Sequence, residues 1–179
     1  MDIDLTKYVI GDKRERKLNR FSCSELYYLL NGYTNIKDYV SGKDLTPQEA
    51  WRMKLGTLKH QYLEEYLKSL GYQTEVKKEF KYGDIELVGI ADALNLDYGI
   101  EIKTSDKVKT QSSRSHEYQA RLYCSLFDVP VFHIMQPIID GNKAVLKEIG
   151  KVKKNDKWWQ EQLERINEFY KIILKDYVK

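Results

Sequence analysis

The chain is poor in cysteine: its 179 residues include only two, Cys23 and Cys124. They form no Cys-x-x-Cys pair, so neither a cysteine-based zinc site nor a cysteine-ligated iron–sulfur cluster can be assembled from one chain. Both lie in segments with helical patterning. We therefore expect two buried free thiols.

Long apolar runs and phosphate-binding glycine loops are also missing. No apolar run is long enough to span a bilayer, and residues 1–4 lack the pattern of a signal peptide. No Gly-x4-Gly-Lys-Ser/Thr loop occurs, which excludes a P-loop motor on this chain. We expect an intracellular, cytoplasmic protein without a membrane partner.

The composition is typical of one soluble globular domain. Hydrophobic residues make up 42% of the chain and charged residues 32%, and no repeat or low-complexity linker divides it. The net charge of +3 permits nucleic-acid binding without requiring it. We expect a basic N-terminal arm at residues 1–20, with a short strand at 7–10, followed by a single domain at residues 21–179.

Cap and turn signals divide this domain into helices and strands. Thr46-Pro47 with Glu49 is a strong helix opening, and Gly71 is a C-terminal stop. Runs of alternating polar and apolar residues predict strands. The predicted helices cover residues 21–31, 46–70, 115–127 and 156–177. The predicted strands cover residues 72–82, 85–96, 99–104, 131–139 and 143–149. The order is that of a mixed α/β fold with a sheet flanked by helices.

One short acidic pattern lies within the predicted strands. Gly89-Ile90-Ala91-Asp92 is followed nine residues after the Asp by Glu101-Ile102-Lys103. Side chains along a strand alternate, so Glu101 and Lys103 share one face and Ile102 turns to the opposite, packed face. Asp92 stands in an otherwise apolar strand, where a carboxylate is costly unless it is paired, hydrogen-bonded or bound to a metal. If the two strands are neighbours, the charged groups converge on a spot that suits a hard divalent cation.

The predicted helix at 46–70 carries a histidine that could join this spot. Gly56, His60 and Glu64 are spaced by four and lie on one helix face. A lone histidine on a helix is usually an ordinary residue, but beside Asp92 and Glu101 it would complete a mixed nitrogen–oxygen site. Manganese tolerates a nitrogen ligand more readily than magnesium does. Apolar residues at helical spacing on the same helix are Leu55, Leu58, Tyr62, Leu63, Tyr66 and Leu67.

Polar residues that follow the acidic pattern are candidates for positioning a substrate. On the predicted helix at 115–127, Gln119 and Tyr123 are four residues apart and face the same way. Gln119 could hydrogen-bond catalytic groups or a phosphate, whereas Tyr123 either packs in the core or touches a nucleic-acid backbone. Lys107, Lys109 and Arg114 precede this helix and are candidates for sequence-independent phosphate contacts.

Taken in order, these patterns resemble the motif set of RecB-like nucleases of the PD-(D/E)XK superfamily. The matching motifs, over about residues 55–125, are Gly56-x3-His60-x3-Glu64, Gly89-x2-Asp92, Glu101-x-Lys103 and Gln119-x3-Tyr123. Each motif alone is common, whereas the ordered set is specific. The resemblance implies a restriction-endonuclease-like αβββαβ core with a central mixed sheet, which agrees with the predicted order of elements.

The resemblance also implies metal-dependent hydrolysis of DNA phosphodiester bonds. The residues it places around one or two Mg²⁺ or Mn²⁺ ions are His60, Asp92, Glu101 and, through its backbone carbonyl, Ile102. The catalytic set it implies is Lys103, Asp92, Glu101 and Gln119. Tyr123 would contact nucleic acid together with the basic residues of the preceding loop.

Small CRISPR-adaptation nucleases and viral exonucleases are similar to the chain in size. The CRISPR enzymes carry four cysteines for an iron–sulfur cluster. In this chain only Cys23 matches one of them, the first, so we expect a relative without the cluster. We therefore expect a viral or recombination exonuclease that acts on single-stranded or duplex DNA ends, in the host cytoplasm if viral. It would act alone, as a homo-oligomer or with a separate helicase or recombination partner.

Two other interpretations stay open beside the exonuclease. One is a structure-specific DNA endonuclease with the same site. The other is a nuclease-fold DNA-binding module that has lost catalysis, against which the complete His/Asp/Glu/Lys set argues. An interaction protein with purely surface charges would leave Asp92 in its apolar strand without a physical reason.

Overall fold

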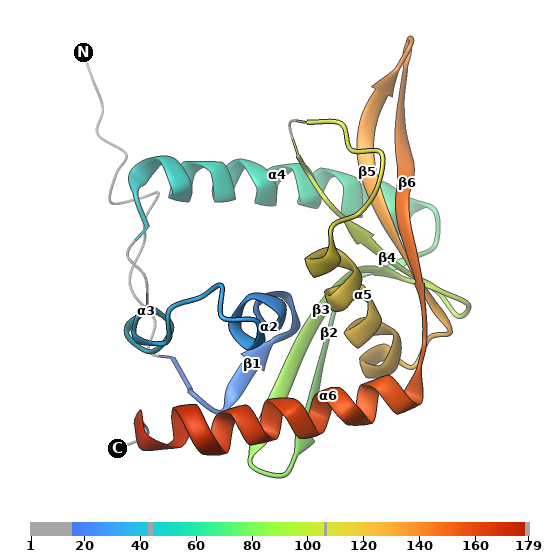
Figure 1. Ribbon diagram of the computed structural model, residues 1–179. Helices are drawn as coiled ribbons and strands as arrows, with labels where there is room; N and C mark the ends of the chain where they lie inside the picture. The colour runs from blue at the N-terminus through green and yellow to red at the C-terminus, as the bar shows by residue number, and fades with distance from the viewer. Residues whose placement is uncertain (1–15, 43–44, 106, 178–179) are drawn as a thin grey trace, which may run out of the picture.

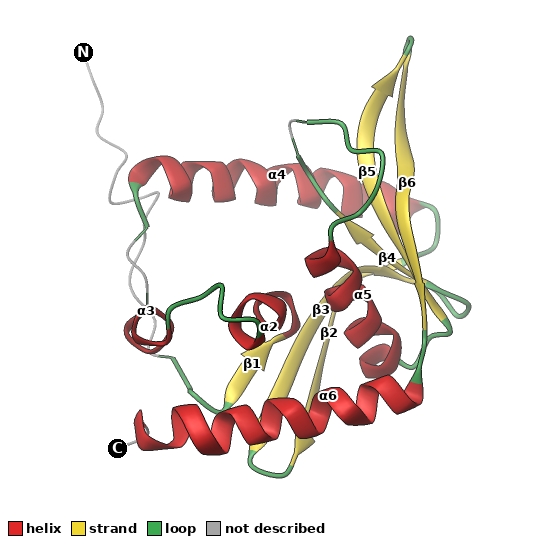
Figure 2. Ribbon diagram, in the orientation of Figure 1, coloured by secondary structure: helices red, strands yellow, loops and turns green. Residues whose placement is uncertain are grey.

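The protein folds into a six-stranded mixed sheet with helices on both faces (Figures 1 and 2). The computed structural model describes residues 16–42, 45–105 and 107–177. The predicted fold class, a mixed α/β fold with a restriction-endonuclease-like core, is confirmed. Among the described residues, none of the helices has the length and apolarity needed to cross a bilayer.

The elements follow one another in the order expected for that core. The helices are α2 (Cys23–Leu30), α3 (Ile36–Ser41), α4 (Pro47–Ser69), α5 (Arg114–Phe127) and α6 (Asp156–Phe169), and α6 continues into a π-helical turn η1 (Tyr170–Leu174) and a 3-10 turn η2 (Lys175–Tyr177). The strands are β1 (Arg20–Ser22), β2 (Gln73–Tyr82), β3 (Ile85–Leu94), β4 (Gly99–Ile102), β5 (Val131–Asp140) and β6 (Lys143–Lys153).

The helices begin where their cap signals indicate. At the start of α4, Thr46 accepts a hydrogen bond from the backbone N–H of Glu49, and the Glu49 carboxylate accepts one from the backbone N–H of Thr46 at 2.9 Å. The side chains of Ser113 and Asn155 cap α5 and α6, each by accepting a hydrogen bond from the backbone N–H three residues later. Gly71, which has a φ of 91°, follows the end of α4. The predicted bounds of these helices are correct to within two residues at their starts.

Three local features differ from the sequence-based expectation. Residues 20–22 form the short strand β1 ahead of α2, and residues 36–41 form the unpredicted helix α3. The predicted strand at residues 7–10 lies outside the described residues. Of the predicted basic arm, the structure describes residues 16–20, where Arg16 pairs with Glu25 at 3.0 Å and lies over the ring of Tyr39.

The sheet divides at β3. Strand β2 pairs with β3 in antiparallel register along the whole strand, from Tyr82↔Ile85 to Gln73↔Leu94. Strands β1 and β4 therefore share the other edge of β3, at opposite ends: β1 pairs with residues 86–88 and β4 with residues 93–94. Among the described residues, the segment 89–92 of β3 has no strand partner on that edge. Beyond this split, β4 pairs with β5 in parallel and β5 pairs with β6 in antiparallel.

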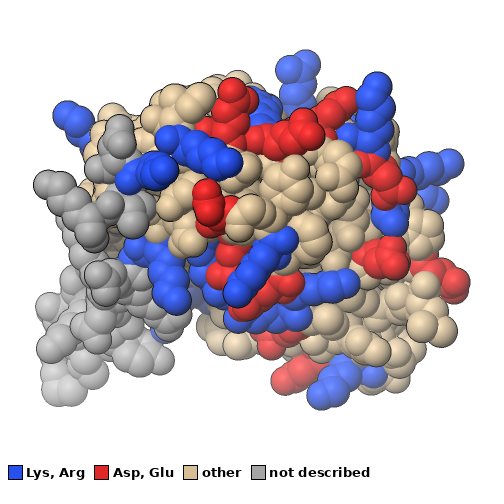
Figure 3. All heavy atoms as spheres, turned by 90° about the horizontal axis from the view of Figure 1, so that it is seen from below, with Lys and Arg blue, Asp and Glu red and all other residues tan. Residues whose placement is uncertain are grey.

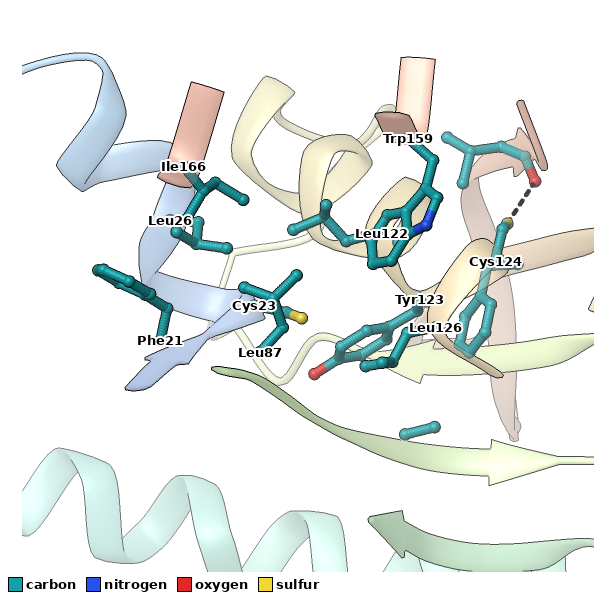
Figure 4. Packing of buried hydrophobic residues seen from close by; sticks show 14 of the residues in the cluster. Phe21, Cys23, Leu26, Leu87, Leu122, Tyr123, Cys124, Leu126, Trp159 and Ile166 are labelled. Atoms are coloured by element: carbon teal, nitrogen blue, oxygen red, sulfur yellow. Dashed lines mark hydrogen bonds between the residues drawn. The ribbon is translucent and has the colours of Figure 1, made fainter. Parts of the chain in front are cut away.

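The main core lies between the sheet and the helices α2, α5 and α6. It contains Leu26 of α2, Leu122 of α5, Leu163 of α6 and Leu87 of β3, all fully buried. Figure 4 shows Cys23 and Tyr123 side by side within this cluster. Both Cys23 and Cys124 are buried free thiols, as predicted.

Helix α4 covers the opposite face with a smaller cluster. Its Leu67 packs with Ala93 of β3 and with Ile100 and Ile102 of β4. In Figure 1, α4 crosses one side of the molecule and α6 the other, with the sheet between them. Most of the apolar residues that the spacing marked on α4 are exposed, namely Leu55, Leu58, Tyr62 and Tyr66.

The described residues on the face that carries α6 form no large patch of one charge. Lys and Arg side chains alternate there with Asp and Glu side chains (Figure 3). A polyanion would meet both signs on this face, so its charge pattern gives no reason to place a nucleic acid there.

Candidate active site

The split in the sheet brings the acidic pattern together. Strands β3 and β4 pair at Ala93↔Ile100 and separate one residue further on. The carboxylate of Asp92 spans the opening and accepts a hydrogen bond from the backbone N–H of Ile102 at 2.5 Å. Lys103 directly follows β4, and its ammonium donates to Oε1 of Glu101 on β4 at 2.5 Å. Ile102 turns into the packed cluster under α4, as the alternation of side chains predicts.

Helix α4 adds two ligand-type side chains to Asp92. His60, Glu64 and Asp92 each offer one ligand atom, and these three atoms lie within 4.8 Å of one another. The His60 Nδ1 is 3.5 Å from Asp92 Oδ1. His60 and Glu64 reach the same spot because residues four apart on a helix lie one above the other.

Helix α5 completes the site from the other face of the sheet. Gln119 is buried and accepts a hydrogen bond from Lys103 Nζ at 2.9 Å. The Gln119 amide donates to Glu101 Oε1 at 2.9 Å and to the Tyr123 hydroxyl at 3.0 Å. Side chains from helices on both faces thus meet through the split, with Asp92 reaching α4 and Glu101 reaching α5.

Crowding of carboxylates perturbs the protonation of the site. Burial and the negative charge of Asp92 raise the pKa of Glu101, and Lys103 and His60 oppose this shift. Burial and Asp92 likewise raise the pKa of Glu64. The hydrogen bond to Asp92 raises the pKa of His60. Three acids held this close are an unfavourable arrangement for the protein alone, and such arrangements are typical of functional sites.

The donor set fits a divalent cation. Among the described residues, the buried Glu101 Oε2 has no hydrogen-bond partner, so one carboxylate oxygen of the site remains unsatisfied. A cation beside His60, Glu64, Asp92 and Glu101 would satisfy this oxygen and relieve the repulsion that raises the acid pKa values. One imidazole nitrogen among several carboxylate oxygens suits Mg²⁺ or, better, Mn²⁺.

The two motif glycines have different structural roles. A Cβ at Gly89 would lie 2.4 Å from Leu126 Cδ2 and 2.9 Å from Tyr123 Cε1, so this glycine allows α5 to approach β3 closely. A Cβ at Gly56 would meet its nearest neighbour, Thr104 Oγ1, at 3.8 Å, which is ordinary contact. Of these two glycines, Gly89 is therefore the one at which a neighbouring element approaches closely.

Tyr123 supports the site from behind. Its side chain is 3% exposed, its ring packs under Gly89 and its hydroxyl accepts the bond from Gln119. Of the two sequence-based interpretations of Tyr123, core packing fits this burial and a contact with nucleic acid does not.

The basic loop before α5 lies next to the site. Lys107 and Arg114 are exposed, and Lys109 is partly buried. The loop backbone is held by Gln136 of β5, whose amide donates to the Lys107 carbonyl at 2.8 Å while its oxygen accepts from the Lys109 N–H at 2.8 Å. Because Gln136 is itself buried, these contacts tie the loop to the sheet.

Sequence reasoning did not assign roles to two of these residues. Glu64 was placed on the same helix face as His60, but the ligand set did not include it; its spacing of four was the available signal. Gln136 occupies an inward position between Ile134 and Ile138 of an apolar strand, and a polar residue there was the available signal.

Comparison with known proteins identifies the fold. No protein-family model and no curated protein sequence matches the chain. Among solved structures, the crystal structure of SSO0001 matches with a TM-score of 0.65 at 23% identity, covering 95% of this chain and 82% of that one. The alkaline exonuclease LHK-Exo from Laribacter hongkongensis matches with a TM-score of 0.57 at 13% identity, covering 86% and 87%. A phage-related exonuclease from Haemophilus somnus 129PT matches with a TM-score of 0.52 at 13% identity, covering 88% and 96%.

These likenesses extend over most of each chain, so they concern the whole fold. The chain shares its fold with structures that include two exonucleases. At such low identity the likeness concerns the fold, and the chemistry of this chain has to be argued from its own side chains.

Proposed function

We propose that the chain is a divalent-metal-dependent deoxyribonuclease, and specifically an exonuclease that hydrolyses phosphodiester bonds at DNA ends. The observation that carries this proposal is the cluster of His60, Glu64 and Asp92 beside the Glu101–Lys103–Gln119 network, at the split between β3 and β4. The exonuclease names of two structural neighbours support it, as does the structure of LHK-Exo in complex with dAMP.

The cation would be held by side chains from α4, β3 and β4. His60, Glu64, Asp92 and Glu101 are the side-chain ligands, with the backbone carbonyl of Ile102 as a further one. A divalent cation in such a site supplies Lewis-acid polarisation of a phosphodiester and lowers the pKa of a water molecule. Because Asp92 is hydrogen-bonded to the backbone of β4, its carboxylate is oriented before any ligand arrives.

Lys103 and Gln119 would act on the phosphate and on its attacking water. The Lys103 ammonium is hydrogen-bonded to Glu101 and Gln119, so its position is set by partners from β4 and α5. From there it can donate to the charge that develops on the phosphate or assist deprotonation of the nucleophile. The Gln119 amide fixes the positions of the Glu101 and Lys103 side chains, and the Tyr123 hydroxyl fixes the position of Gln119.

Basic residues next to the site would hold the DNA backbone. Lys107 and Lys109 lie on the loop that leads from β4 to α5, and Arg114 is the first residue of α5. Gln136 fixes this loop against the sheet. Contacts of this kind are independent of sequence, as the degradation of DNA ends requires.

Hydrolysis of labelled DNA tests the proposal. End-labelled linear and circular DNA, single- and double-stranded, is incubated with Mg²⁺, Mn²⁺ or a chelator. We expect degradation of linear substrates with metal, no hydrolysis in the chelator, and a severe loss of rate in Lys103→Ala. The matched control is Lys151→Ala, an exposed lysine on β6.

Each alternative has its own outcome. Cleavage of circular DNA with metal would identify an endonuclease. DNA binding without any hydrolysis by the wild type would identify a catalytically inactive binding module. A rate in Lys103→Ala equal to that of the wild type would remove the catalytic role of the lysine.

A further inference from the structure

Three tyrosines form a compact aromatic cluster at the end of α2. The rings of Tyr27 and Tyr33 stack at a centroid distance of 5.9 Å with 25° between their planes. Tyr28 meets Tyr27 edge to face at 5.6 Å and Tyr33 at 6.5 Å. Tyr33 is 69% exposed and Tyr28 is 44% exposed. One face of the Tyr33 ring therefore rests on Tyr27, and most of the remaining ring surface is open to solvent.

The backbone of the helix end holds this cluster in place. Gly32 has a φ of 71°, which turns the chain back, and the Tyr33 N–H donates to the Tyr28 carbonyl at 2.9 Å. The Asn31 side chain donates to the Tyr27 carbonyl at 2.7 Å. Tyr33 is thus presented by a closed turn, which lowers the entropy lost when a ligand stacks on it.

Tyr28 connects the cluster to α5, the helix that carries Gln119. The Tyr28 hydroxyl donates to Ser115 Oγ at 3.0 Å, and Ser115 is in the first turn of α5. Gln119 follows four residues later on the same helix face, and it holds Lys103. The exposed Arg114 directly precedes Ser115, so a positive charge stands at the same end of α5.

We propose that Tyr28 and Tyr33 form a stacking platform for the bases of single-stranded DNA that enters the site. An exposed aromatic ring binds a nucleotide through the face of its base. Inside a duplex these faces are covered by neighbouring base pairs, so the platform favours an unpaired strand, whose successive bases can all stack. This inference rests on the proposed nuclease function and deepens it, because it identifies a single strand as the form of DNA that reaches the site.

The exposed Tyr62 on α4 lacks this setting. Tyr62 is 75% exposed on α4, but it is two residues from both His60 and Glu64 and so points away from the site face. It borders an apolar groove of about 330 Å³ with Pro137 and Ile138 of β5. Tyr62 therefore provides a control of equal chemistry and similar exposure.

Binding in the absence of metal tests the platform without hydrolysis. The probe is a fluorescein-labelled oligothymidylate of about 15 nucleotides, a length in the range that single-strand grooves cover. It is titrated in a chelator at fixed salt and followed by fluorescence anisotropy. We expect Tyr33→Ala to weaken binding by about tenfold. Tyr33→Phe and Tyr62→Ala should bind as the wild type does.

A second probe separates stacking from a structural effect. In an oligonucleotide of the same length with abasic sites, the phosphates remain and the bases are gone. We expect the wild type to bind this probe more weakly than oligothymidylate, and Tyr33→Ala to cause no further loss. The dependence of binding on salt should be the same for wild type and Tyr33→Ala, because no phosphate contact is removed.

The outcomes distinguish the platform from the nuclease proposal. Equal oligothymidylate affinity of wild type and Tyr33→Ala overturns the platform, and so does an equal loss on the abasic probe. Oligothymidylate affinity that depends on Tyr33, in a wild type that hydrolyses no DNA with Mn²⁺, supports the platform and overturns the nuclease proposal.

Discussion

Relative to the wild type, Asp92→Asn should be at least as stable without a divalent cation and less stable with one. Asparagine has the shape of aspartate and still presents an oxygen to the Ile102 N–H, so the link between β3 and β4 is kept. What is lost is one negative charge beside Glu64 and Glu101. The substitution therefore changes the electrostatics of the site and leaves its backbone support in place.

In a chelator, the variant should be at least as stable as the wild type. The ligand atoms of Asp92 and Glu64 lie within 4.8 Å of each other. Two full charges at that separation repel by about 3.5 kcal/mol at an effective dielectric of about 20. Partial protonation of the raised acids and the lost contact with His60 reduce this figure. We expect a net gain of about 1 kcal/mol at pH 8.

With Mn²⁺, the wild type should be more stable than Asp92→Asn. A cation at a hundred times its Kd stabilises the folded state by about 2.7 kcal/mol. In a chain of this size, that raises the Tm of the wild type by about 5–10 °C. Asp92→Asn lacks a ligand and should show little or none of this rise.

Thermal denaturation followed by circular dichroism, in a chelator and across a Mn²⁺ titration, measures both effects. The matched control is Asp97→Asn, the same substitution at an exposed position in the β3–β4 turn. This control should keep the full rise in Tm. A rise of equal size in Asp92→Asn would refute the assignment of Asp92 as a ligand.

Three further predictions concern α5 and its contacts. Gly89→Ala should lower the free energy of unfolding by about 1–3 kcal/mol in urea titrations, because the added Cβ would overlap Leu126. An unchanged free energy would contradict the close approach of α5 to β3. Burial and the charges of two nearby lysines lower the pKa of His116 from 6.5 to about 4. Between these two pH values the unfolded chain binds a proton at His116 that the folded chain does not. From about pH 8 to pH 5 the wild type should therefore lose up to about 2 kcal/mol more stability than His116→Asn. Unfolding measured as a function of pH tests this difference. Gln119→Leu should reduce the rate of DNA hydrolysis about 10- to 100-fold while the protein still shows the Mn²⁺-dependent rise in Tm, and a normal rate would remove its positioning role.

Much of the fold could be predicted from local signals in the sequence. The Thr46-Pro47 opening and the Gly71 stop predicted α4, because capping and backbone preference act over a few residues. Strand β2 followed from alternating polarity, and β3 and β4 followed from apolar runs on either side of the turn at residues 97–99. Strands β5 and β6 followed from two runs joined by the turn at residues 140–142. Strand β1 escaped prediction because three residues are too few to show a period.

The packing of α4 could not be predicted from its spacing. The apolar residues Leu58, Tyr62 and Tyr66 have helical periodicity, yet they are exposed, and the site face of the helix instead buries Glu64. Periodicity reports that a helix has an apolar face, but the neighbours of that face are decided by the rest of the chain.

The sequence by itself determined which chemistry is available: one histidine, three carboxylates and a lysine. Its spacings put His60 and Glu64 on one helix face and Glu101 and Lys103 on one strand face. Only the tertiary structure decided that these faces meet. The meeting depends on the split between β3 and β4 and on the close approach of α5 at Gly89, which bring His60 from one side of the sheet and Gln119 from the other to the same carboxylates. Such contacts join residues distant along the chain, and no local preference of the backbone encodes them.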